Sequence, residues 1–236
     1  MLVLAIDTAT SHMVTGLVRT PDMAVVAQRS IAGSRAHNEA LVPSVQECLD
    51  EAGVSFGDLD AVVAGVGPGP FTGLRVGMVS AQAIGQALGI PVFGVCTHDA
   101  IAADAAGTAN RAAADTAAAG TAAADRSVLV VTDARRREVY WSAYRGGRRV
   151  AGPDVCAPGQ IPARGEVVVA AESVRGKLEL GQGGVDTRDA VPTPAGLVAV
   201  ADLDARPEPL VPLYLRRPDA VAPSLVVSPA VPAVEL

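Results

Sequence analysis

The chain has 236 residues, which is enough for one large or two small domains. Half of the residues are hydrophobic but only 3% are aromatic, so the core must be built mainly from Val, Ala and Leu. The net charge of −6 argues against broad nucleic-acid binding by this chain alone. Three widely spaced cysteines, without a Cys-x-x-Cys pair, and the lack of a membrane-length apolar run lead us to expect a cytoplasmic protein.

The first hundred residues predict one mixed sheet with crossover helices. Apolar runs predict strands, and helical spacing of apolar residues predicts helices. These elements fall at 2–6, 13–19, 23–30, 34–52, 59–66, 74–88 and 91–96. The first three strands suit a meander, whereas the later strands need the two helices as crossovers. This order is similar to the ribonuclease-H-like half of actin-like ATPases and sugar kinases.

The second half predicts a smaller domain of the same kind. An alanine-rich stretch without an apolar face, 102–125, is expected to be an insert or linker. Beyond it we expect strands at 127–132, 139–144 and 166–171, a hairpin at Gly146-Gly147, a helix at 194–202 and an extended segment at 212–216. The predicted domains are therefore 1–101 and 126–217, followed by a proline-rich tail, 218–236, predicted to be disordered.

A glycine-rich stretch, 65–77, joins a predicted strand to a predicted helix. Thr72 is a candidate cap for that helix. Asp7, Gly67, Gly69 and Thr72 are weak candidates for a phosphate loop. The chain has neither a P-loop nor a dinucleotide-binding motif there, and we favour a rigid turn with Asp7 anchoring its own loop.

Small residues recur every fourth position along the helix that follows. Gly73, Gly77, Ala81, Gly85 and Gly89 form a row on one face. Glycine inside a helix costs about 1 kcal/mol relative to alanine, so close packing must offset the row. Two arrangements do this: the row packs against the protein's own sheet, or a partner helix lies in the groove.

Candidate catalytic residues are few. His12, His37 and His98 lack the spacing of metal ligands, and no Gly-x-Ser-x-Gly motif occurs. We expect each histidine to be a surface or cap residue. An arginine cluster over 135–149 suits either an RNA or acidic-partner contact or a solvated hairpin edge.

Several of these stretches together resemble one family. Residues 5–10, 67–77, 133–135 with 138–141, and 212–216 are similar to the TsaB family, which is related to TsaD. The resemblance implies an α/β, actin-like ATPase (ribonuclease-H-like) fold with two related mixed-sheet lobes, the second smaller and degenerate. TsaD-like proteins hold a metal with His-x-x-x-His, and Thr97 and Ile101 stand at those positions here, so the resemblance implies no metal site.

The resemblance also implies a function and partners. It implies a non-catalytic scaffold that activates TsaD in forming threonylcarbamoyladenosine in tRNAs reading codons that start with A. The alternative is an active ATPase, kinase or glycoprotease-type peptidase of the same fold. Expected partners are TsaD and the ATPase TsaE, a second copy when the chain is alone, and tRNA only through the complex; no cofactor is expected. We place the predicted partner interface on His37, Leu41, Val45, Gly73, Val76, Gly77, Met78, Ala81 and Gly85.

Overall fold

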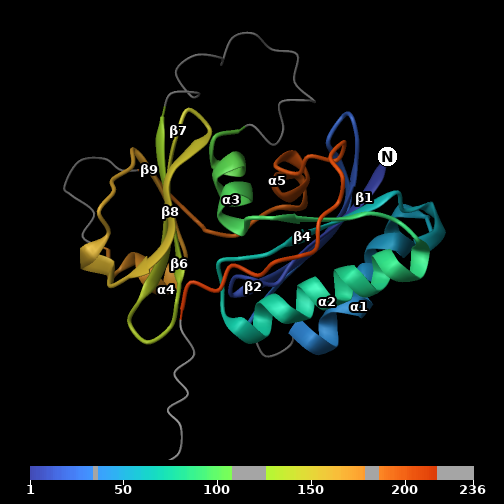
Figure 1. The fold of residues 1–236 in the computed structure, drawn as a ribbon, viewed down its shortest axis with the longest axis horizontal. Helices are drawn as coiled ribbons and strands as arrows, with labels where there is room; N and C mark the ends of the chain where they lie inside the picture. The colour runs from blue at the N-terminus through green and yellow to red at the C-terminus, as the bar shows by residue number, and fades with distance from the viewer. Residues whose placement is uncertain (34–36, 108–125, 179–185, 217–236) are drawn as a thin grey trace, which may run out of the picture.

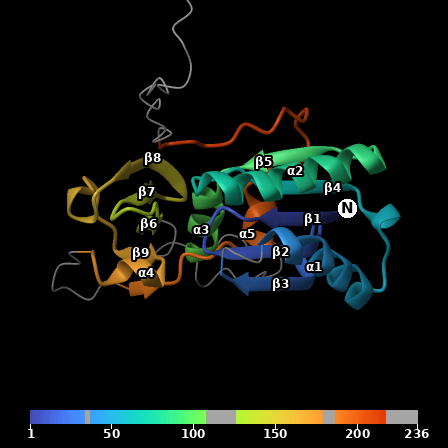
Figure 2. The same ribbon diagram turned by 90° about the horizontal axis from the view of Figure 1, so that it is seen from below.

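The computed structural model describes residues 1–33, 37–107, 126–178 and 186–216. It contains two five-stranded sheets, one in each of two lobes (Figure 1). The proline-rich tail and most of the alanine-rich insert lie outside the described residues. The lobes lie side by side, and α3 lies between them in both views (Figures 1 and 2).

The sheet of the first lobe is mixed, as predicted. Its strands are β1 (Leu2–Asp7), β2 (His12–Arg19), β3 (Ala24–Ala32), β4 (Ala61–Gly65) and β5 (Val92–Val95), in the order β3-β2-β1-β4-β5. The first three strands pair antiparallel, whereas β1, β4 and β5 pair parallel. The meander and the crossovers are thus both confirmed.

Helices cover both faces of this sheet. The helices α1 (His37–Ala52) and α2 (Phe71–Leu88) lie on one face, and α3 (Thr97–Ala105) and α5 (Pro194–Ala199) lie on the other (Figure 1). A strand between two helical layers must be apolar on both sides. Accordingly, Leu4 and Ile6 pack in the α1–α2 core, while Val3 and Ala5 pack in the α5 core.

The second lobe repeats the topology of the first. Its strands are β6 (Ser127–Asp133), β7 (Val139–Arg145), β8 (Arg148–Cys156), β9 (Val167–Ala170) and β10 (Asp186–Arg188), in the order β10-β9-β6-β7-β8. Antiparallel pairs join β6, β7 and β8, and parallel pairs join β6, β9 and β10. Where the first lobe has α1 and α2, this lobe has the 3₁₀ turn Pro158–Gln160 and the four-residue α4 (Glu172–Arg175). It is therefore smaller and degenerate, as expected.

The structure differs from the predicted domain limits in two places. The helix α3 continues to Ala105, and Ala102 is buried between the lobes, so 102–105 do not belong to an insert. The chain also returns to the first lobe after β10. There α5 packs on the first sheet, and the Leu213 amide donates to the Val66 carbonyl at 2.8 Å. Apolar spacing within each segment carries no information about this return.

A membrane-spanning helix is not found among the described residues. Cys48 is fully buried, whereas Cys96 and Cys156 are partly exposed, and all three are free thiols.

Candidate functional site at the glycine turn and the outer face of α2

Asp7 anchors the glycine turn from the end of β1. Its carboxylate accepts a hydrogen bond from Thr97 Oγ1 at 2.6 Å and one from the Ala9 amide at 2.8 Å. The Gly67 amide donates in turn to Thr97 Oγ1 at 3.3 Å. Burial raises the pKa of Asp7 from 3.8 to about 6, because desolvation outweighs these hydrogen bonds. The bond to the Ala9 amide is the expected Asx turn, and the whole network fixes the loop.

Of the other phosphate-loop candidates, Gly67 and Gly69 are packed inside the turn, whereas Thr72 is exposed. Gly67 has a positive φ of 101°, and Gly69 lies so close to the Ala9 carbonyl that a side chain has no room. Thr72 is not the helix cap, because α2 begins at Phe71 with Pro70 as its N-cap residue. The turn therefore holds β1, β4 and α2 together, in line with the rigid-turn interpretation.

The row of small residues on α2 faces the protein's own sheet. Thr8 Oγ1 donates to the Gly73 carbonyl at 2.7 Å and accepts from the Gly77 amide at 3.0 Å. A side chain at Gly73 would meet the Thr8 carbonyl at 2.6 Å, and one at Gly85 would overlap Val92. Gly73 and Gly77 thus pack against Thr8, which follows β1, and Gly85 packs against Val92 of β5, whereas Gly89 is the C-cap of α2 with open space around it. The partner groove that we considered along this row is wrong.

Other residues of the predicted interface are also internal. Leu41 and Val45 are each 1% exposed, Ala81 is fully buried, and Val76 packs against the same core. His37 begins α1, and its side chain lies outside the described residues. The first four of these residues therefore belong to the core of the first lobe and are not available as a surface.

The outer face of α2 carries an exposed aromatic cluster at the start of the helix. The Phe71 ring is 49% exposed and lies 4.9 Å from the ring of Tyr214, which is 40% exposed. The Arg75 guanidinium stacks over Phe71 at 3.7 Å and donates to the Tyr214 hydroxyl at 3.1 Å. One turn further along, Val79 is 66% exposed. Sequence analysis missed Phe71 and Arg75, although their spacing of four with Val79 indicates a common helical face.

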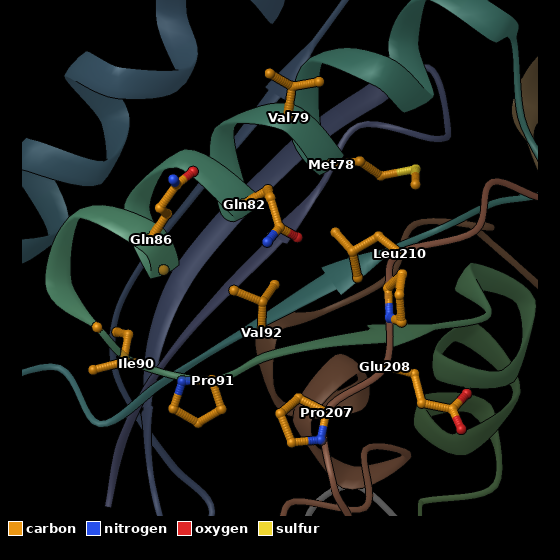
Figure 3. A pocket seen from close by; sticks show the side chains of 13 residues that line it. Met78, Val79, Gln82, Gln86, Ile90, Pro91, Val92, Pro207, Glu208 and Leu210 are labelled. Atoms are coloured by element: carbon orange, nitrogen blue, oxygen red, sulfur yellow. The ribbon is translucent and has the colours of Figure 1, made fainter.

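A groove runs beside this face, between α2 and the segment 207–210 (Figure 3). Its volume is about 690 Å³. The lining is mainly apolar and includes Met78, Val79, Val92 and Leu210, while Gln82 supplies a polar group. Of the predicted interface residues, only Met78 and Gly85 line this groove.

His98 is a buried structural residue, which corrects the expectation of a surface or cap histidine. Its two ring nitrogens lie 2.8 Å from Ser142 Oγ and 2.9 Å from Thr132 Oγ1. Burial lowers its pKa to about 3, so the ring is neutral and joins α3 to the second sheet through hydrogen bonds.

The arginine cluster is two separate patches in space. Arg135, Arg136 and Arg137 lie in the turn between β6 and β7, whereas Arg145 and Arg148 flank the turn between β7 and β8. Because β7 runs the length of the sheet, these turns lie at its opposite ends. The arginines of 135–149 are therefore close in sequence but do not form one continuous binding surface.

Comparison with known proteins identifies relatives along most of the chain. Residues 29–179 match the model of the family described as TsaD, tRNA N6-adenosine threonylcarbamoyltransferase. An uncharacterized protein of Mycobacterium tuberculosis is 48% identical over 218 residues, which cover 92% of this chain and 93% of that protein. The tRNA threonylcarbamoyladenosine biosynthesis protein TsaB of Escherichia coli is 35% identical over 145 residues, covering 61% of this chain and 55% of that protein.

A solved structure matches the fold across both lobes. It is the crystal structure of a Pseudomonas aeruginosa protein with similarity to peptidase YeaZ. The match has a TM-score of 0.66 and 25% identity, and it covers 91% of this chain and 99% of that one. The two related mixed sheets and these matches define a two-lobed protein of the actin-like, ribonuclease-H-like class. Within this class the chain belongs to the TsaD family, as a member of its TsaB group.

The metal site of TsaD-like proteins does not fit the residues present. Thr97 is buried and its hydroxyl donates a hydrogen bond to the Asp7 carboxylate, and Ile101 packs in the core between the lobes. Among the described residues, no three His, Cys, Asp or Glu side chains lie together as a metal site would require.

Proposed function

We propose that this chain is a non-catalytic subunit that binds and activates a TsaD-type catalytic subunit, which forms threonylcarbamoyladenosine in tRNA. The family assignment supports a role in forming threonylcarbamoyladenosine in tRNA. The two positions where TsaD-like proteins hold a metal support the lack of catalysis, since Thr97 and Ile101 serve packing instead. The ATPase TsaE would join this complex, and tRNA would bind to it rather than to the chain alone.

One observation carries the pairing: α2 presents exposed apolar groups on the face away from its own sheet. Phe71, Tyr214 and Val79 all contribute to this face, and an apolar groove adjoins it. Exposed apolar and aromatic surface of this kind is typical of a protein interface. A TsaD subunit of the same fold would present its own corresponding helix, so related faces would pair. The same face would join two copies of this chain when TsaD is missing.

The alternative of an active ATPase or kinase lacks a comparable observation. The Asp7 carboxylate is buried and is already held by Thr97 and the Ala9 amide. A metal-bound nucleotide would have to displace these bonds.

The test is Val79→Asp, with Val150→Asp as a matched control. The two valines are 66% and 63% exposed, but Val150 lies on β8 of the second lobe. Neither change affects the core, so both variants should fold. Val79→Asp would bury a carboxylate in the interface, so it should weaken the affinity for TsaD by about tenfold or more. Calorimetry measures this affinity. Equal affinities of the two variants would place the interface elsewhere.

A separate assay tests the lack of catalysis. The purified chain, given tRNA and the threonylcarbamoyl adenylate, should give no modified tRNA, whereas addition of TsaD should restore the reaction. Product formed by the chain alone would refute this part of the proposal.

A further inference from the structure

The groove between α2 and the segment 207–210 suits an apolar ligand without charge (Figure 3). Its volume of about 690 Å³ lies within the range of about 300–1,000 Å³ that is usual for ligand sites. Among the described residues that line it, Glu208 is the one with a charged side chain. A nucleic acid or an acidic peptide would therefore find no cation in this groove.

The two walls of the groove favour an extended peptide. Pro207 and Pro209 have no amide hydrogen, so their wall does not offer the regular hydrogen bonds of a β-strand. On the other wall, the Gln82 side chain points from α2 toward the groove (Figure 3). A glutamine amide can both donate to and accept from a peptide backbone. A polyproline-type segment, which needs few backbone partners, therefore fits between these walls.

The C-terminal tail of the chain has the composition that this groove requires. Residues 220–234 carry no charged side chain, and they include five valines, one leucine and three prolines. The other long segment outside the described residues, 108–125, contains one arginine and two aspartates and no apolar side chain larger than alanine. Of these two segments, the tail is therefore the one that can cover an apolar surface.

The place where the tail begins lets it reach the groove. Tyr214 contacts Phe71, the first residue of α2, and Arg216 follows Tyr214 by two residues. The groove extends along residues 78–89 of α2 and its C-cap, about 10–27 Å from Phe71 at 1.5 Å per residue. Residues 225–227 follow Arg216 by 9–11 positions, and an extended chain of that length spans about 30 Å. The apolar centre of the tail therefore reaches the groove when the chain turns back along α2.

We propose that residues 220–234 bind in this groove and compete there with TsaD. The inference rests on the proposed function and adds a regulation of the same site. Val79 lines the groove and also belongs to the face that we assign to the partner, so the tail and TsaD cannot both cover it. A tethered segment acts at an effective concentration in the millimolar range, so even a weak contact is mostly formed. TsaD then binds only the fraction of molecules whose groove is open.

A peptide titration tests the binding of the tail. In the full chain, residues 220–234 are replaced by Gly and Ser at the same length, and a fluorescently labelled peptide of sequence 220–234 is added. Fluorescence anisotropy should show that this Gly/Ser-tail variant binds the peptide. Wild type should bind it at least about fivefold more weakly, because its own tail occupies the groove. No binding, or equal binding by wild type and the variant, would overturn the proposal.

Two substitutions in the Gly/Ser-tail variant locate the peptide. Val79→Asp places a carboxylate at the groove and should weaken peptide binding by about fivefold or more. Val150→Asp is the matched control on the second lobe and should leave peptide binding unchanged. Equal affinities of these two variants for the peptide would mean that the tail binds elsewhere, and the proposal would be wrong.

Calorimetry with TsaD tests the competition. The Gly/Ser-tail variant should bind TsaD about five- to tenfold more tightly than wild type, because its groove stays open. The matched control replaces 108–122, which is also fifteen residues long, by Gly and Ser and should bind like wild type. Neither replacement alters a described residue. Unchanged or weaker binding by the tail variant would refute the competition. If neither wild type nor the tail variant binds TsaD, the proposed function fails, whereas the peptide titration still decides whether the tail occupies the groove.

Discussion

Gly77→Ala in α2 is expected to destabilise the protein, although alanine is the better helix former. Its amide donates to Thr8 Oγ1 at 3.0 Å, and a methyl group there would overlap this oxygen while it lies 3.4 Å from Thr8 Cβ. The same oxygen donates to the Gly73 carbonyl at 2.7 Å. Thr8 would therefore have to move and lose both hydrogen bonds inside the core.

The size of the effect follows from opposing contributions. Overpacking a close-packed site costs about 1–3 kcal/mol. Each lost hydrogen bond adds about 1 kcal/mol. Alanine regains about 1 kcal/mol of helix propensity. We expect Gly77→Ala to lower the free energy of unfolding by about 2–4 kcal/mol.

Urea unfolding followed by circular dichroism measures this change. Gly176→Ala is the matched control. Gly176 has a φ of −67°, and a Cβ added there would have no other atom within 4 Å. The control should be neutral or slightly stabilising. Thr8→Ala removes the obstructing oxygen, so Gly77→Ala should cost much less in that background. A Gly77→Ala protein as stable as the control would refute the packing of α2 on β1.

Two further predictions concern the carboxylates of Asp7 and Asp104. Burial raises the pKa of Asp7 above its value in the unfolded chain, so its contribution to stability is greatest below pH 4 and is lost as the pH rises through about 6. Relative to Asp7→Asn, wild type should therefore lose roughly 2 kcal/mol of unfolding free energy between pH 4 and 7, and a pH-independent difference would contradict this. Asp104 accepts hydrogen bonds from the amide of Thr193 at 2.9 Å and its hydroxyl at 2.7 Å, at the start of α5. Asp104→Ala should cost about 1–3 kcal/mol in urea unfolding, against almost nothing for the exposed Asp204→Ala, and equal stabilities would mean that α3 and α5 are not coupled there.

Much of the fold could be predicted from local sequence patterns. The apolar run 2–6 predicts a strand that is buried on both faces, and alternation in 139–143 places Val139, Trp141 and Ala143 in one core. Both outcomes follow from side-chain periodicity, which acts within an element. The strand β10 and the short α4 were missed, because three or four residues are too few to establish a period.

The site was harder to predict because it depends on which face of α2 is covered. The row of small residues indicates close packing, but it does not identify the neighbour. Only tertiary structure shows that Thr8 and Val92 fill the row. The contact between Tyr214 and Phe71 could not be predicted for the same reason, because the two residues lie 143 positions apart in the sequence.

The two lobes share a topology but differ in the helices that cover their sheets. In the first lobe, α2 is 18 residues long and uses small residues to lie close to Thr8 and Val92, while Phe71 and Val79 on its other side are exposed. In the second lobe, the corresponding helix α4 has only four residues and has no such outer face. Among the described residues, a long helix with an exposed apolar side is therefore found on the first lobe and not on the second. The partner interface that we propose therefore uses α2 of the first lobe, and the short α4 of the second lobe offers no equivalent of it.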